Sequence, residues 1–296
     1  MFWFCPKIKQ SLILFAAVLT LSVSLCVCGS ISGYAATVAG SGIEKNERAR
    51  IDYSATAEGY IRVQYTGTTT KRLKVKVKGP ATEYIYDIVP GPDYTFSLSD
   101  GNGAYKVTIF ENVSGQKYAN VLTAGMDVKV KDEFAPFLVS NQFVDYAHAP
   151  KSVKLAETLC SGKKDLEKVA AVYDYVVGDI SYDQELAVNV KSGYLPVLDD
   201  VLLTRKGICF DYGALMAGML RSQKIPCKLV VGYAGTAYHA WIDVWTKETG
   251  WITEAIKFDG SKWHRLDPTF ASSAGSSDEV MKFIGDGTNY TAKFFY

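Results

Sequence analysis

The chain has 296 residues, of which 48% are hydrophobic and 21% are charged. This length suits one large domain or two ordinary ones, and the composition is that of a globular protein with a substantial core. The formal net charge is +1, so the composition offers no broad positive field to a nucleic acid. Nucleic-acid binding is therefore not expected.

Residues 1–35 have the pattern of an export signal. Two lysines precede the uncharged apolar run 11–27, and residues 33–35 fit a small-x-small cleavage site. Two alternatives stay open. One is an uncleaved membrane anchor, because the apolar run approaches the length that spans a bilayer. The other is lipidation at Cys26 or Cys28. In each case the rest of the chain lies outside the cytoplasmic membrane. Contact with a membrane is expected only through an N-terminal anchor.

Three cysteines follow this segment, namely Cys160, Cys209 and Cys227. An odd number in an exported protein leaves at least one thiol free, unless it pairs between chains. A disulfide between Cys160 and Cys227 is an arrangement that the sequence leaves open. The sequence contains no CxxC pair, HExxH motif or EF-hand-like acidic loop. No metal or other cofactor is therefore predicted.

The sequence pattern of residues 36–131 predicts a linker followed by a β-domain. Residues 36–46 are small and polar and are interpreted as the linker. Short runs that alternate apolar with polar residues, separated by Gly and Pro turn signals, predict a β-sandwich over residues 47–131. These runs are 60–65, 73–78, 105–110 and 126–130. The region has no His or Cys, so we expect a spacer, or a module that binds carbohydrate or a surface protein.

A second domain of mixed helices and strands is predicted over residues 151–296. Residues 132–150, which contain two prolines and little periodicity, are interpreted as the joint between the domains. Helical spacing follows at 151–160 and 165–177. The aromatic end, 293–296, is expected to pair as a final strand against this domain.

Cys209 opens a further helical pattern. Its apolar face is formed by Leu215, Met216, Met219 and Leu220. A cysteine at a helix N-terminus lies beside unpaired backbone N–H groups and the positive end of the helix dipole, which favour a reactive thiolate. Gly207 permits a tight approach to the helix start. The alternative for this cysteine, taken alone, is a small buried core residue.

A histidine and an aspartate lie on strand-like runs that follow. Alternation in the run 238–245 places His239 on one face with Trp241, Asp243 and Trp245. A carboxylate beside a histidine holds the orientation and tautomer of its ring. Asp267, which precedes a proline, is the candidate for this carboxylate. Taken alone, His239 is interpreted as a satisfied core residue and Asp267 as part of a strand-ending turn.

Together these stretches resemble the transglutaminase-like superfamily, which has the papain-like thiol arrangement and the chain order Cys, His, Asp. The matching stretches are Gly207-x-Cys209-x-x-Tyr212-Gly213, residues 225–233, His239-Ala240-Trp241 and Leu266-Asp267-Pro268-Thr269. The resemblance covers about residues 165–270. More specifically, the chain is similar to exported transglutaminase-domain proteins of Gram-positive bacteria, which carry an immunoglobulin-like module in front.

The resemblance implies an α+β papain-like catalytic domain that follows an immunoglobulin-like sandwich. It also implies catalytic roles for three residues. Cys209 would be the nucleophile, His239 the general base and acid, and Asp267 the carboxylate that orients the histidine. The Cys209 N–H is the expected oxyanion donor, and the second donor stays open between the candidates Tyr182 and Tyr194.

Substrate contacts are predicted at Trp241, Phe210 and Tyr212. The residue after the cysteine is commonly small in the superfamily, so the bulk of Phe210 is expected to narrow the acyl pocket. This departure bears on the substrate rather than on the three catalytic candidates.

The expected chemistry is acyl transfer through a cysteine thioester. Water as the acceptor gives a peptidase or amidase that acts on peptide or protein substrates, and the resemblance favours it because bacterial members are more often hydrolytic. A lysine amine as the acceptor gives a cross-linking protein-glutamine γ-glutamyltransferase. The third alternative is a non-catalytic cell-surface binding module with a vestigial triad.

Overall fold

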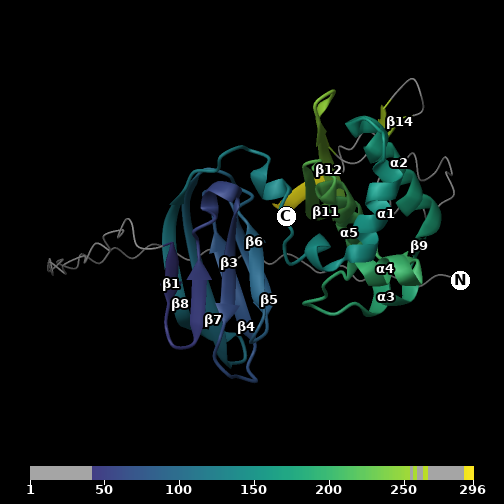
Figure 1. Ribbon diagram of the computed structural model, residues 1–296. Coiled ribbons are helices and arrows are strands. Elements are labelled where there is room, and N and C mark those ends of the chain that lie inside the picture. The colour runs from purple at the N-terminus through teal and green to yellow at the C-terminus, as the bar shows by residue number, and fades with distance from the viewer. Residues whose placement is uncertain (1–41, 254–255, 259–262, 266–289) are drawn as a thin grey trace, which may run out of the picture. The chain divides into compact units, whose positions relative to one another are not determined.

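The computed structural model describes residues 42–253, 256–258, 263–265 and 290–296 (Figure 1). The predicted export signal and its alternatives, an anchor or a lipidated cysteine, lie outside these residues. So does Asp267. Within the described ranges, no helix has the length and apolar composition needed to cross a membrane.

Eight strands form an N-terminal β-domain of two antiparallel sheets, with the strand orders β1-β2-β3-β6 and β5-β4-β7-β8. Figure 1 shows the two sheets as layers. A single 3-10 turn, η1 (Thr56–Glu58), precedes β3. The strands are β1 (Ile43–Lys45), β2 (Ala49–Asp52), β3 (Tyr60–Tyr65), β4 (Leu73–Lys78), β5 (Glu83–Ile88), β6 (Asp93–Ser97), β7 (Gly103–Ser114) and β8 (Lys117–Val128).

The side chains of this domain alternate between a shared core and the surface. Ile61 and Val63 of β3 and Val75 and Val77 of β4 are fully buried, whereas the residues between them are partly exposed. The strands predicted over 60–65 and 73–78 are therefore confirmed. β5 and β6 lie outside the predicted runs. The immunoglobulin-like character of the domain stays a prediction.

The boundary predicted for the linker differs from the structure. β1 lies inside the stretch 36–46, because Ile43 to Lys45 pair in register with Asp52 to Arg50 of β2. The Tyr53 N–H also donates to the Gly42 carbonyl. Ordered backbone thus begins before residue 47.

The joint consists of irregular chain and two 3-10 turns, η2 (Ala135–Phe137) and η3 (Tyr146–His148). It covers the outer edge of β6. The Gln142 N–H donates to the Thr95 carbonyl at 3.3 Å, and the Asn141 amide donates to the Ser97 hydroxyl at 2.9 Å. The joint therefore occupies one sheet edge of the β-domain.

The second domain, here called the helical domain, packs helices against a sheet of order β13-β12-β11-β16. The short pairs β9–β10 and β14–β15 complete it. Its helices are α1 (Pro150–Cys160), α2 (Asp165–Asp179), α3 (Gln184–Asn189), α4 (Leu198–Thr204) and α5 (Cys209–Ser222). Its strands are β9 (Ser181–Tyr182), β10 (Lys206–Gly207), β11 (Cys227–Ala234), β12 (Ala237–Thr246), β13 (Gly250–Ile252), β14 (Ile256–Phe258), β15 (Trp263–Arg265) and β16 (Tyr290–Phe295).

Predicted elements of the helical domain agree with the observed ones. The helices expected over 151–160 and 165–177 are α1 and α2. The final strand is confirmed as β16, which pairs antiparallel with β11. α3 and α4 are short helices that lie outside the predicted runs.

α5 is the central helix of this domain. Every residue from Asp211 to Arg221 is buried, so the helix has no exposed face, in contrast to the single apolar face expected from its sequence. The Arg221 guanidinium, which is fully buried, donates to the carbonyls of Val139, Cys227 and Tyr296. It thereby ties the joint, β11 and the residue after β16 to α5. Burial lowers the pKa of Arg221 to about 10.

Candidate functional site

The start of α5 is fixed by contacts around Cys209, its first residue. The Ile208 N–H donates to the Asp211 carboxylate at 2.8 Å, and the first helical bond joins the Tyr212 N–H to the Ile208 carbonyl at 3.1 Å. Gly207 is required here, because an added Cβ would lie 2.6 Å from the Asp211 Cβ. The N–H groups of Cys209 and Phe210 precede the first intrahelical bond and are available to an anion.

Asp211 connects the start of α5 to a neighbouring loop. Its carboxylate is 1% exposed and accepts the Tyr194 hydroxyl at 2.8 Å as well as the Ile208 N–H. Burial raises the pKa of Asp211, although both hydrogen bonds oppose this effect. The loop of residues 190–195 is thus held beside Cys209 through Tyr194.

His239 lies on β12 in aromatic surroundings. It is 7% exposed and pairs with Gly232 of β11. Its ring centroid lies 6.4 Å from that of Trp241 and 6.4 Å from that of Tyr290 of β16. β16 approaches so closely that a Cβ on Gly232 would clash with the Thr291 carbonyl oxygen. The His239 ring therefore has little contact with water.

Cys209 and His239 line one cleft of about 520 Å³, here called the thiol cleft. Its other lining residues come from four parts of the chain. They are Glu83, Ile85, Tyr86 and Asp87 of β5; Gln142 and Phe143 of the joint; residues 190–195 after α3; and Phe210, Val231, Tyr238, Ala240, Phe294 and Tyr296 of the helical domain, together with Tyr182, Ala187 and Ile208. Most of these side chains are apolar or aromatic, and β5 forms one wall.

The predicted site residues occupy different places. Cys209 and His239 come together in the thiol cleft, and Phe210 lines it beside them. Trp241 is 2% exposed and Tyr212 fully buried, its hydroxyl donating to the Ile180 carbonyl at 2.6 Å. Neither is among the described residues that line the cleft, so their substrate contacts stay predictions, as does the role of Asp267.

The candidates for a second oxyanion donor, Tyr182 and Tyr194, both line the thiol cleft. The hydroxyl hydrogen of Tyr194 goes to Asp211, so this tyrosine presents an acceptor oxygen rather than a donor. Sequence reasoning did not include β5, Phe143 or Tyr238 in the site. These residues reach the site through contacts between segments far apart in the chain, which no local sequence pattern indicates.

The other two cysteines are free, buried thiols. Burial raises the pKa of Cys227 to about 12 and raises the pKa of Cys160 as well. Both therefore stay protonated at neutral pH. Cys209 is partly exposed, which makes it the accessible thiol among the three.

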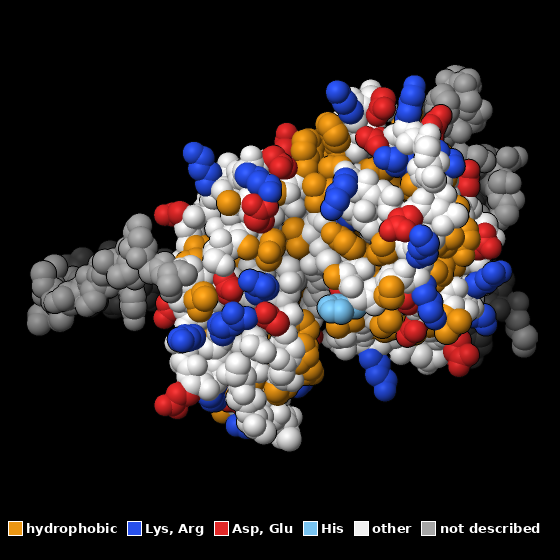
Figure 2. All heavy atoms as spheres, viewed as in Figure 1, with side chains coloured by type: hydrophobic (Ala, Val, Ile, Leu, Met, Phe, Trp, Pro, Cys, Tyr) orange, Lys and Arg blue, Asp and Glu red, His pale blue; other side chains and the backbone are white. Residues whose placement is uncertain are grey.

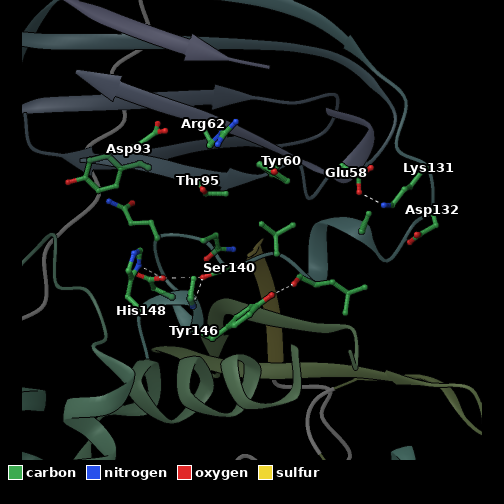
Figure 3. Close-up of a pocket in the computed structure, with 18 residues that line it drawn as sticks. Glu58, Tyr60, Arg62, Asp93, Thr95, Lys131, Asp132, Ser140, Tyr146 and His148 are labelled. Atoms are coloured by element: carbon green, nitrogen blue, oxygen red, sulfur yellow. Dashed lines mark hydrogen bonds and ion pairs between the residues drawn. The ribbon is translucent and has the colours of Figure 1, made fainter. Parts of the chain in front are cut away.

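A second cavity, of about 530 Å³, lies between the outer face of β3 and β6 and the joint, and is here called the polar hollow (Figure 3). Tyr60, Arg62 and Thr95 face it from the strands, and Ser140, Tyr146 and His148 from the joint. Glu58 pairs with Lys131 within the hollow, whereas Arg62 and Asp93 pair with Asp52 and Arg50, which do not line it. The hollow contains no cysteine among the described residues that line it.

The polar hollow holds a serine, an aspartate and a histidine, but not as a catalytic relay. The Ser140 hydroxyl donates to Asp145 at 3.1 Å, and His148 Nδ1 lies 2.8 Å from the same carboxylate. The serine hydrogen is thus directed to the carboxylate and not to the imidazole that a relay requires. Over the described ranges, no group of three His, Cys, Asp or Glu side chains is arranged to hold a metal ion.

Charged side chains of both signs are interspersed on the face shown in Figure 2. This face therefore presents no extended field of a single sign.

Part of the helical domain is similar to known proteins. Residues 153–268 match the family model described as the transglutaminase-like superfamily. A protein-glutamine gamma-glutamyltransferase of Pseudomonas aeruginosa is 35% identical over 71 residues, which are 19% of this chain and 11% of that protein. The kyphoscoliosis peptidase of Mus musculus is 28% identical over 119 residues, which are 40% of this chain and 18% of that protein. The matched stretches span less than a fifth of either relative.

A solved structure of a candidate cysteine protease from Cytophaga hutchinsonii is also similar. It has 16% sequence identity and a TM-score of 0.40, and the match covers 80% of this chain and 83% of that chain.

Proposed function

Because residues 153–268 belong to the transglutaminase-like superfamily, whose members are typically cysteine-dependent enzymes, we propose that this chain transfers acyl groups through a thioester on Cys209. One observation carries the proposal. Cys209 begins a buried helix, and the buried His239 lines the same cleft. A thiol, unpaired N–H groups and an imidazole are the parts that nucleophilic catalysis at a carbonyl needs.

The reaction proceeds in two balanced steps. The Cys209 thiolate attacks the carbonyl carbon of an amide, the C–N bond breaks, and the His239 imidazolium gives its proton to the departing amine. Water then attacks the thioester, His239 takes its proton, and the thiolate leaves with a carboxylic acid as product. The Cys209 N–H would stabilise the oxyanion of both steps, a contribution of about 3 kcal/mol in comparable sites. Asp267 is proposed to orient His239.

Hydrolysis is the proposed outcome, so the protein would be a peptidase or amidase acting on peptide or protein amides. Amine transfer, which would make it a protein-glutamine γ-glutamyltransferase, is the second candidate, because one relative bears that name. Another relative is called a peptidase, a name that agrees with hydrolysis. The two outcomes use the same thioester and differ only in the acceptor. A vestigial site in a surface-binding module is the non-enzymatic alternative.

Export of the chain is part of the proposal and rests on the pattern of residues 1–35 alone. Determining the N-terminal residue of the protein secreted by a bacterial host tests it. An N-terminus near residue 36 supports cleavage, whereas a lipid-modified cysteine or an intact Met1 would replace that interpretation.

Selective alkylation tests the nucleophile. At pH 7, iodoacetamide should modify Cys209 and leave Cys160 and Cys227 intact, because burial keeps both protonated. Mass spectrometry of tryptic peptides gives the three rates in one sample. Equal rates for Cys209 and Cys160 in the folded protein would contradict the proposal.

A glutamine peptide, offered with and without a primary amine, separates the two acceptors. Release of ammonia with formation of glutamate in both samples indicates hydrolysis. Incorporation of the amine into the peptide indicates transfer and would replace the hydrolase by the cross-linking enzyme. The Cys209→Ala variant is the control for contaminating activity.

A further inference from the structure

β5 is the edge strand of its sheet, and the direction of its backbone groups follows from one hydrogen bond. The Gly79 N–H donates to the Thr82 carbonyl at 2.9 Å, immediately before β5 begins. Residues that bond to the neighbouring strand alternate in an antiparallel ladder. Since Thr82 bonds toward β4, the even-numbered residues of β5 do so too. The outward-directed backbone groups are therefore those of Glu83, Ile85 and Asp87.

A second contact confirms this direction. The Asp87 carbonyl accepts a hydrogen bond from the Gln142 side chain at 2.7 Å, on the side of β5 away from β4. Beyond the strand, the Val89 N–H donates to the Tyr94 hydroxyl at 3.2 Å. The C-terminal end of this edge is thus partly satisfied by side chains, which is a common way to protect an exposed edge.

The middle of the edge has no such protection. Among the described residues, none forms a hydrogen bond to the outward N–H or C=O of Ile85. The Ile85 side chain is 54% exposed, and an exposed apolar residue on an edge strand favours pairing with another chain. By contrast, the joint covers the edge of β6, where the Thr95 carbonyl is already bonded.

The outward-directed residues of β5 line the same cleft as the nucleophile. Glu83, Ile85 and Asp87 line the thiol cleft together with Cys209. The loop of residues 190–195 meets the C-terminal end of β5, since a Cβ on Gly193 would lie 3.8 Å from the Asp87 carboxylate. The cleft is thus a groove that has a free strand edge as one wall.

We infer that an extended segment of the acyl-donor polypeptide adds to β5 as a further strand and so presents its amide to Cys209. This inference rests on the proposed function and names the substrate class of the same site. Main-chain bonds to Ile85 would supply affinity, and the pockets along the groove would select alternate side chains. Phe143, Phe210 and Phe294 line the groove, so apolar side chains beside the reactive residue fit it best.

Proline at position 85 tests the main-chain contact. Ile85→Pro removes the outward N–H without removing a bond to β4, and proline is tolerated on sheet edges. With a peptide of alternating Val and Thr around a central glutamine, the ratio of its kcat/KM to that of acetylglutamine amide should fall about tenfold, the size expected for losing one or two main-chain bonds.

The matched control is Val113→Pro. Val113 is 58% exposed, lies at a register shift of β7 where it has no cross-strand partner, and is not among the described residues that line the thiol cleft. The ratio should stay at the wild-type value in this variant. An equal fall in both variants, or none in Ile85→Pro, overturns the inference.

Binding to the Cys209→Ala variant keeps the inference testable apart from catalysis. Fluorescein-labelled versions of the same peptide, each N-methylated at one position, should lose about tenfold in affinity at alternate positions only, because a strand directs every second N–H to its neighbour. Uniform losses at all positions, or none, overturn the inference even if the enzyme is active. If Cys209 fails the alkylation and turnover tests while the alternating pattern persists, the proposed chemistry fails and the strand-docking inference stands.

Discussion

The thiol cleft and the polar hollow are cavities of nearly the same volume, about 520 and 530 Å³. Both are bounded by strands of the β-domain on one side and by later segments of the chain on the other. They differ in what the backbone contributes. A helix begins in the thiol cleft at Cys209, whereas the polar hollow is bounded by 3-10 turns and irregular chain.

The difference extends to the histidines. His239 is 7% exposed and surrounded by aromatic rings, whereas the His148 side chain is 85% exposed and lies against Asp145. A buried imidazole that lines the same cleft as a partly exposed thiol can move a proton where electrostatic effects are strong. An exposed imidazole paired with a carboxylate is an ordinary surface interaction. Cavity volume alone therefore does not distinguish a reactive site from a solvated gap.

The largest expected effect separates the two histidines. His239→Ala should lower kcat by about a hundredfold to ten-thousandfold, the usual contribution of a general acid–base group. His148→Ala should leave kcat at the wild-type value. Both are measured with the glutamine peptide after circular dichroism has confirmed folding. If the two variants lose activity equally, the assignment of chemistry to the thiol cleft is wrong.

A pair of tyrosines gives the next comparison. Tyr194 donates to Asp211 at 2.8 Å beside the nucleophile, and Tyr146 donates to the Leu138 carbonyl at 2.7 Å in the polar hollow. Tyr194→Phe should release the loop of residues 190–195 and lower kcat/KM about tenfold, whereas Tyr146→Phe should cost about 1 kcal/mol of stability and leave kcat/KM unchanged. Steady-state kinetics and urea unfolding measure both quantities. Equal kinetic effects would show that Tyr194 acts through general stability only.

The regular elements that carry the site could be predicted because their physical signals are local. Alternation of apolar and polar residues locates β3 and β4, and helical spacing with a glycine before it locates the start of α5. Cys209 and His239 could be brought together only through the chain order of a known family. Neither residue has a spacing that fixes the other, since a helix and a strand separate them.

The rest of the site depends on contacts between distant parts of the chain. β5 forms a wall of the thiol cleft although more than a hundred residues separate it from Cys209, and nothing in the run Glu83–Ile88 indicates that neighbour. The buried Arg221 is another example: its three carbonyl partners come from the joint, β11 and the end of β16. Such a cation would be expected on the surface from sequence alone.

The buried carboxylate of Asp211, at the start of α5, predicts a dependence of stability on pH. Burial raises the pKa of Asp211, so the folded state holds this proton more tightly than the unfolded chain does. The stabilisation is fully present below the ordinary carboxyl pKa of about 3.9 and is lost as the pH rises through the raised value in the folded protein. Asp211→Asn should remove this part of the slope, which is at most about 1.4 kcal/mol per pH unit. Urea unfolding at a series of pH values measures it, and an unchanged slope would contradict the assignment.

The smallest expected effect lies in the polar hollow. Lys131 and Glu58 form an ion pair at its rim, and both side chains are about half exposed. Because solvent and salt screen such a pair, Lys131→Met should leave the midpoint of urea unfolding unchanged within error, at low and at high salt. A clear shift of the midpoint that disappears in high salt would show that the charges of the polar hollow hold the joint against the β-domain. In that case the charges of the polar hollow would stabilise the fold, and the hollow would not be a solvated gap. The two cavities would then differ in function: one would stabilise the protein and the other would carry the chemistry.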